Sequence, residues 1–111
     1  MIYHMCRTEE WAVAEAAGVY HGSSQDEADG FIHFSTAEQI VESARRHRTG
    51  QAGLVLVAVD GALLGPRLHW EPSRDGALFP HVYGPIYPSE SASVRPLTIG
   101  PDGQHVFPPL E

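Results

Sequence analysis

The sequence predicts a single α+β domain over residues 1–111, with two helices near the amino end and mostly antiparallel strands after them. Three observations lead to this fold class. The length suits one hydrophobic core. The expected elements run strand, helix, strand, helix and then several strands. No GxGxxG turn follows a strand, which argues against a doubly wound nucleotide-binding fold.

The composition is that of an acidic globular protein. Apolar residues make up 42% of the chain and the formal net charge is −7, so broad nucleic-acid binding is not expected. All seven basic residues are arginine, which excludes lysine Schiff-base chemistry and a P-loop lysine. The single cysteine, Cys6, excludes an internal disulfide and fits a reducing compartment. Since neither a signal peptide nor a membrane span is recognisable, we expect a cytoplasmic protein.

The amino-terminal part predicts a strand, a helix and a loop. Residues 2–6 form a short apolar strand. Thr8 is the expected cap of a helix that ends at Gly18, a residue type common after the last helical turn. Residues 19–30 are rich in glycine, serine and acids, and we expect an exposed loop there.

A second strand and helix follow. Residues 31–34 predict a short strand, and Ser35 with Glu38 matches the capping box of a helix over residues 36–47. The expected buried face of this helix consists of Ile40, Val41 and Ala44. Its carboxyl end carries arginines that suit the helix dipole, with phosphate binding as the alternative: Arg45, Arg46 and Arg48.

The second half of the chain predicts a sheet. Residues 54–59 are almost unbroken in their apolar character, which indicates a central strand buried on both faces. A hairpin is expected around the turn Pro101-Asp102-Gly103. The expected strands after the central one are short and spaced by prolines, at residues 68–71, 78–79, 82–87, 93–99 and 105–107.

Three histidines stand out because each lies in or beside an apolar run. They are His4, His33 and His81. A polar ring in such a strand needs a hydrogen-bond partner or faces a cleft. A buried, satisfied histidine is the usual explanation for one such residue, but three together favour a cleft. Three of the four other histidines, His21, His47 and His105, are interpreted as surface residues.

Other chemistries find less support. No HExxH, CxxC or HxH spacing occurs, so we expect no bound metal. Ser35 is not in a GxSxG elbow and reads as a helix cap. Cys6 and His4 share one face of the first strand, which allows a Cys–His pair, although packing is the commoner role of such a thiol. Glu71, next to Trp70, is the best candidate for a catalytic acid or an acceptor for a ribose hydroxyl.

The segments Ile2-Tyr3-His4, Asp29-Gly30-Phe31-Ile32-His33-Phe34-Ser35-Thr36 and Phe79-Pro80-His81-Val82-Tyr83-Gly84-Pro85 carry a resemblance. With Gln39 and Trp70-Glu71 they resemble a small bacterial family of uncharacterised domains, over nearly the whole chain. That family is similar in fold to the ADP-ribosyltransferases. The resemblance implies a split, mostly antiparallel sheet, with a cleft between the first two strands and residues 70–85.

The resemblance also implies roles for single residues. His4 matches the first-strand histidine that holds the ribose and nicotinamide side of NAD, and His33 matches the second-strand position. The RNA 2′-phosphotransferases share this His–His pairing. The third position, often a glutamate that orients the ribose 2′-hydroxyl, is contested here by Glu71 and His81.

These roles lead to one leading hypothesis and two alternatives. The leading hypothesis is a cleft for a nucleotide of the NAD or ADP-ribose type, with NAD as substrate. Its expected ligand contacts are His4, Phe34, Ser35 and Tyr83, with positive charge from Arg7, Arg67, Arg74 or a helix amino end. One alternative is a phosphotransferase or hydrolase that acts on a phosphorylated ribose. The other is a binding module without catalysis, which a cleft lined only by histidines and aromatic rings would favour.

Overall fold

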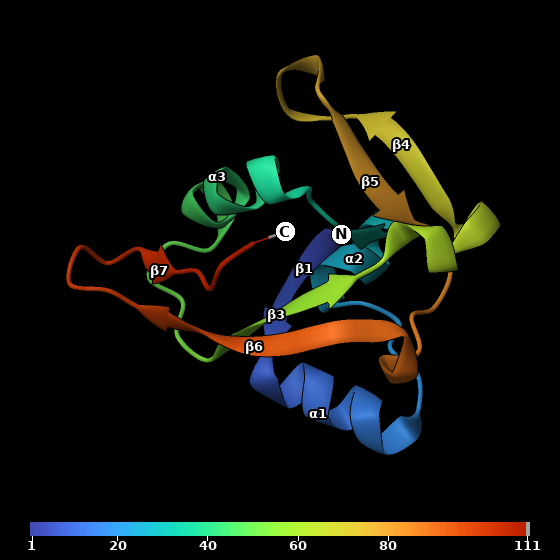
Figure 1. Ribbon diagram of the computed structural model, residues 1–111, viewed down its shortest axis with the longest axis horizontal. Helices are drawn as coiled ribbons and strands as arrows, with labels where there is room; N and C mark the ends of the chain where they lie inside the picture. The colour runs from blue at the N-terminus through green and yellow to red at the C-terminus, as the bar shows by residue number, and fades with distance from the viewer. Residues whose placement is uncertain (111) are drawn as a thin grey trace.

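The computed structural model describes residues 1–110 and has an α+β architecture with two antiparallel sheets (Figure 1). The first sheet has four strands in the order β1 (Ile2–Arg7), β3 (Leu54–Val59), β6 (Ser91–Ile99) and β7 (His105–Val106). The second has three strands in the order β2 (Ile32–His33), β5 (Leu78–Val82) and β4 (Leu68–Pro72). The helices are α1 (Thr8–Ala17), α2 (Ser24–Asp29) and α3 (Ala37–His47).

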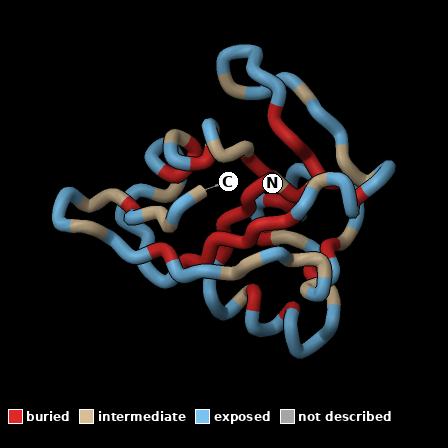
Figure 2. Tube along the Cα trace, in the orientation of Figure 1, coloured by how far each residue is buried: buried red, intermediate tan, exposed pale blue. Residues whose placement is uncertain are grey.

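Strand β3 is the centre of the larger sheet, as the apolar run predicts. All six of its residues are buried, and it pairs with β1 on one side and β6 on the other. Because side chains alternate along a strand, its odd-numbered residues pack with Trp11 of α1 and its even-numbered residues with Ile40 of α3. The sheet is therefore covered on both faces, and Figure 2 shows buried chain concentrated along β1 and β3.

The first helix begins and ends close to the predicted positions. Arg7 is the residue before the helix, and its backbone N–H donates to Glu10 Oε1 (2.8 Å), so the helix starts one residue earlier than a Thr8 cap implies. At the other end Gly18 has a φ of 78°, and its N–H bonds the carbonyl of Ala14. Glycine adopts this left-handed conformation without strain, which explains the stop.

The expected loop at residues 19–30 was wrong, because it contains the helix α2. Ser23 caps this helix, and Asp26 accepts a hydrogen bond from the Ser23 backbone N–H (2.7 Å). Gly30 ends it with a φ of 84°. The helix escapes a search for apolar periodicity because its one buried residue is an aspartate. Residues 1–110 therefore contain three α-helices rather than the two expected.

Two further expectations need correction in α3. Its capping pair is Thr36 and Gln39 rather than Ser35 and Glu38, with the Thr36 N–H 3.0 Å from Gln39 Oε1. Ser35 instead exchanges backbone hydrogen bonds with Tyr3 of β1. Val41 is exposed and Ser43 takes the expected place on the buried face.

The later strands are close to the prediction, with one change. The strand expected at 78–79 continues through Pro80 to Val82 as β5, whereas the strand expected at 82–87 is not formed: beyond Val82 only Ile86 bridges to Tyr20. Pro80 has no N–H, but its carbonyl accepts from the Phe34 N–H (3.0 Å), so its place in the sheet still contributes a hydrogen bond. The predicted hairpin is confirmed: β6 and β7 pair antiparallel around Gly103.

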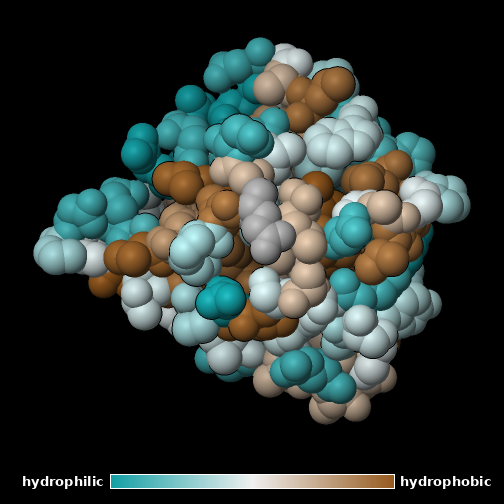
Figure 3. All heavy atoms as spheres, in the orientation of Figure 1, coloured by the Kyte–Doolittle hydropathy of each residue, from teal (hydrophilic) through white to brown (hydrophobic). Residues whose placement is uncertain are grey.

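The two sheets meet where β1 approaches the segment after β2, through the bridge between Tyr3 and Ser35. The β4–β5 hairpin projects away from the larger sheet (Figure 1). On the face shown in Figure 3, apolar residues gather across the middle and hydrophilic ones lie above them. None of the helices in residues 1–110 is long and apolar enough to cross a membrane.

Candidate functional site: a histidine-lined cavity between the two sheets

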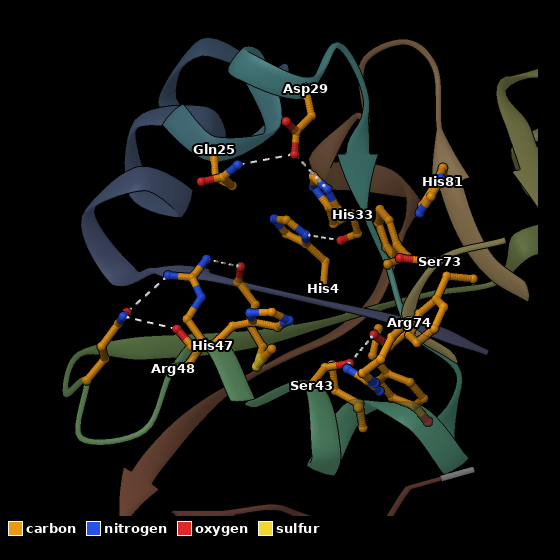
Figure 4. A pocket seen from close by; sticks show the side chains of 17 residues that line it. His4, Gln25, Asp29, His33, Ser43, His47, Arg48, Ser73, Arg74 and His81 are labelled. Atoms are coloured by element: carbon orange, nitrogen blue, oxygen red, sulfur yellow. Dashed lines mark hydrogen bonds and ion pairs between the residues drawn. The ribbon is translucent and has the colours of Figure 1, made fainter. Parts of the chain in front are cut away.

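A cavity of about 570 Å³ opens between the two sheets (Figure 4). Its walls come from β1, α2, β2, α3, the segment after α3, the β4–β5 turn and β5. The volume lies inside the range of about 300–1,000 Å³ that is typical of small-molecule sites. The cavity has the location that the resemblance implies, between the first two strands and the segment from residue 70 onward.

His4 lies in the wall beside β1 and uses both ring nitrogens inside the protein. Its Nδ1–H donates to the backbone carbonyl of His33 (2.6 Å), since a carbonyl oxygen only accepts. Its Nε2 therefore accepts from the Tyr20 hydroxyl (2.6 Å). Burial lowers the pKa of His4 below its usual range, so the ring is neutral. His4 fixes the geometry around it and leaves no ring nitrogen for a ligand.

Cys6 lies on the same strand and its environment makes it unreactive. Burial raises the pKa of the thiol to about 12. The Tyr20 hydroxyl donates to the other residue of the Cys–His pair that the sequence allows, His4. Cys6 behaves as a packing residue.

His33 on β2 is held between two carboxylates. Its Nδ1 lies 2.6 Å from Asp26 Oδ1 and its Nε2 lies 3.0 Å from Asp29 Oδ2. Carboxylates only accept hydrogen bonds, so the His33 Nδ1–H donates to Asp26, while Asp29 approaches the other ring nitrogen. The His33 side chain is 41% exposed and lines the cavity.

Asp26 is the buried anchor of this arrangement. Burial alone would raise its pKa, but the hydrogen bond from the His33 ring, nearby His4 and backbone N–H donors outweigh it and lower the pKa to about 2. Its Oδ2 accepts from both the N–H and the hydroxyl of Ser23. Sequence reasoning missed Asp26 because it lies in the supposed loop, although the Ser-x-x-Asp spacing of a capping box was the available signal.

His81 and Glu71, the two candidates for the third position, act as one unit. Glu71 Oε1 accepts from His81 Nδ1 (2.7 Å) and from the Tyr83 hydroxyl (2.7 Å). These hydrogen bonds lower the pKa of Glu71 below its usual range. His81 is buried and lines the cavity, and its Nε2 has no hydrogen-bond partner within residues 1–110. The same carboxylate–imidazole arrangement orients the base in serine hydrolases.

Phe31 brings the two carboxylate-supported histidines together. Its ring stacks on His81 at a centroid distance of 4.1 Å and contacts His33 at 4.5 Å. The His33 and His81 ring centroids are 5.7 Å apart. Two histidines with separate carboxylate partners therefore stand next to each other in one wall.

Positive charge reaches the cavity from Arg48 and Arg74. The sequence named Arg74 among its candidates, and assigned Arg48 to the end of a helix. The other two candidates lie elsewhere, because Arg7 pairs with Glu10 and Arg67 with Glu90, outside the cavity lining. In residues 1–110 neither cavity arginine forms an ion pair with a carboxylate.

The structure brings most of the predicted site residues to this cavity. The lining includes five of them: His4, His33, Phe34, Ser35 and His81. Glu71 and Tyr83 are not part of the lining and connect to it through His81. Within the described chain, no group of three or more His, Cys, Asp or Glu side chains converges as a metal site.

The histidines expected at the surface are not all exposed. His21 and His47 are exposed, and His47 also lines the cavity. The expectation of a surface position for His105 was wrong. It is 9% exposed, and its Nε2 lies 2.7 Å from the carbonyl of Gln51, because the β6–β7 hairpin folds back onto the segment after α3.

Comparison with known families identifies the class to which this fold and cavity belong. The family model described as Protein of unknown function (DUF952) matches residues 5–94. The match covers most of the sequence, and the chain belongs to this family.

Solved structures of one bacterial protein are similar to this chain. The crystal structure of protein CC0527 from Caulobacter crescentus has 46% identical residues and a TM-score of 0.91, covering 95% of this chain and 92% of that chain. The solution NMR structure of CC0527 has 47% identity and a TM-score of 0.84, covering 93% and 89%. A comparison with the curated proteins found no match.

Proposed function

We propose that the cavity binds a nucleotide of the NAD or ADP-ribose type, with the ligand ribose against His33 and His81. The observation that carries this proposal is the placement of two carboxylate-supported histidines 5.7 Å apart in one cavity wall. The ADP-ribosyltransferase-like resemblance supports the same ligand class, since its first and second strands supply His4 and His33.

The geometry assigns His4 a supporting part in this proposal. Its ring holds the His33 carbonyl and the Tyr20 hydroxyl, so it fixes β2 against β1. Ring surfaces for a ligand base come from Phe34 and Phe79, which both line the cavity. Tyr83 supports Glu71 rather than the ligand.

A second candidate function is phosphoryl transfer or hydrolysis on a phosphorylated ribose. The pairing of histidines favours it, because such a reaction needs one group to accept a proton and another to donate one. His81, with Nε2 unpaired and Nδ1 held by Glu71, fits the acceptor. His33 fits the donor to the leaving oxygen only through Nε2, where a bound ligand would take the place of the partly exposed Asp29 while Asp26 keeps Nδ1.

An acid in the lining favours an enzyme over a simple binding module. Asp29 lines the cavity and its side chain is 39% exposed, so it is accessible to a ligand hydroxyl. A binding module would need only rings and hydrogen-bond donors there.

Calorimetry with NAD, ADP-ribose and a nucleotide carrying a ribose 2′-phosphate tests the proposal. We expect binding of at least one of them, with a dissociation constant from about micromolar to millimolar. His33→Asn and His81→Asn should weaken it about tenfold, since each removes an imidazole hydrogen bond to the ligand. His21→Asn is the matched control, because His21 is exposed and lies outside the lining. Absence of binding by the folded protein at millimolar concentration would refute the proposal.

A further inference from the structure

We propose that Arg48 and Arg74 form two separate anion-binding points in the cavity, so that its preferred ligand is a nucleoside carrying two separate phosphates. This inference rests on the proposed nucleotide site and selects its second candidate ligand, a phosphorylated ribose, over NAD and ADP-ribose, whose two phosphates form one diphosphate. Neither residue has a carboxylate partner within residues 1–110.

The contrast with the other arginines is the first support. Arg45 and Arg46 both pair with Glu42 on the exposed face of α3, at 3.0 Å and 2.9 Å. In a protein of net charge −7, carboxylates are the abundant partners. Arginines that line a cavity without one leave their charge available for an anionic ligand.

Arg74 is held in place by contacts with neutral groups. Its guanidinium lies over the Phe79 ring at 4.9 Å, and its Nη1 is 3.4 Å from Ser43 Oγ. It stands at the turn between β4 and β5, next to Asp75, whose φ of 58° is left-handed. The turn therefore aims a half-buried cation into the cavity from the side of the smaller sheet.

Arg48 approaches from the end of α3. Its Nη1 donates to Gln51 Oε1 (3.1 Å) and its Nη2 lies 3.4 Å from the carbonyl of Met5. A guanidinium has five N–H donors, so several stay available. Both neutral contacts fix the side chain without neutralising it.

The two arginines enter from different sides. Figure 4 shows Arg48 and Arg74 on opposite sides of the view, with His4 between them and His33 above. A ligand with phosphates on two different ribose positions would reach both, and would place its ribose toward the histidines.

The test compares adenosine, adenosine 5′-monophosphate and adenosine 2′,5′-bisphosphate by calorimetry at one fixed, low salt concentration. Each added phosphate should tighten binding about tenfold. Arg74→Gln should abolish one of the two increments and Arg48→Gln the other. Arg95→Gln is the control, because Arg95 is exposed on β6 and outside the cavity lining. Circular dichroism confirms that each variant is folded, and Arg48→Lys and Arg74→Lys retain charge if a glutamine variant does not fold.

The outcomes separate this inference from the proposed function. If nucleotides bind but the second phosphate adds no affinity, or if the arginine variants bind like the wild type, the inference is overturned and the nucleotide site stands. If adenosine nucleotides, NAD and ADP-ribose all fail to bind, both are overturned. The inference is supported if each added phosphate increases the affinity in the wild type and in Arg95→Gln, and if each cavity variant loses one of these increases.

Discussion

Asp26 is the residue on which the candidate site depends most. It is 3% exposed, yet it is ionised, because the His33 ring and the Ser23 donors offset the cost of its burial. We expect Asp26→Asn to lower the free energy of unfolding by about 2–4 kcal/mol, since it leaves buried donors without a charged acceptor. Urea denaturation measures this change.

Asp29 provides the matched control for Asp26. It also contacts the His33 ring, but its side chain is 39% exposed. Asp29→Asn should change the stability by less than about 0.5 kcal/mol. Equal effects of the two substitutions would contradict the anchoring role of Asp26.

The second prediction concerns His4 and the dependence of stability on pH. Burial lowers its pKa in the folded state, so below the unfolded value of 6.5 the unfolded chain binds a proton that the folded one does not. His4 thus favours folding above pH 6.5, and the stability falls as the pH drops from about 7 to 5, by at most about 1.4 kcal/mol per pH unit. Denaturation of wild type and His4→Gln across this range measures it.

A shallower pH dependence in His4→Gln is the expected result. Asp26 does not confuse the comparison: its lowered pKa means its contribution is present above about pH 4 and is lost only as the pH falls toward about 2. The same slope in both proteins from pH 7 to 5 would show that His4 does not titrate on unfolding in the manner described.

Among the elements, α2 is the short helix that supports the site. Its capping serine, Ser23, also donates to the carboxylate of Asp26 (3.0 Å from Oγ). Ser23→Ala should therefore cost about 1 kcal/mol of stability, as losses of helix caps do. Thermal melting compared with Ser24→Ala, an exposed first-turn residue, gives the measurement. Equal melting temperatures would mean that the cap contributes nothing.

The β4–β5 pair positions a second dyad. Glu71 lies opposite Phe79, so His81 is its diagonal neighbour on the same face of the sheet. If the cavity turns over a phosphorylated ribose, Glu71→Gln should reduce kcat about tenfold to a hundredfold and leave KM nearly unchanged, because Glu71 acts on His81 rather than on substrate. Steady-state kinetics measures both constants, with Glu42→Gln as the control. A change mainly in KM would contradict this role of Glu71.

Sequence patterns predict the strands and helices whose buried side chains are apolar, and they miss those whose buried side chains are polar. The apolar run of residues 54–59 predicts the central strand correctly. Helix α2 was missed because its buried residue is charged. Strand β5 was expected to break at a proline, whose carbonyl in fact serves the sheet.

For the whole molecule, the sequence predicts the α+β class and three cavity histidines, because a polar ring in an apolar run needs a reason. It does not predict how they differ. The Tyr20 hydroxyl occupies Nε2 of His4, and Glu71 and His81, the two candidates for the third position, are joined by one hydrogen bond. Both contacts join residues that are distant in sequence, so sequence patterns do not reveal them. Arg48 was assigned to a helix end, since only the folded chain brings it beside β1.

The central claim is that His33 and His81 face one nucleotide in the cavity between the sheets. NMR titration of the histidine ring signals with NAD, ADP-ribose and a ribose 2′-phosphate nucleotide tests it directly. The account predicts saturable shifts of the His33 and His81 rings, with those of His21 and His105, which lie outside the cavity lining, unchanged. Saturable binding that shifts His21 or His105 and leaves His33 and His81 unmoved would contradict it.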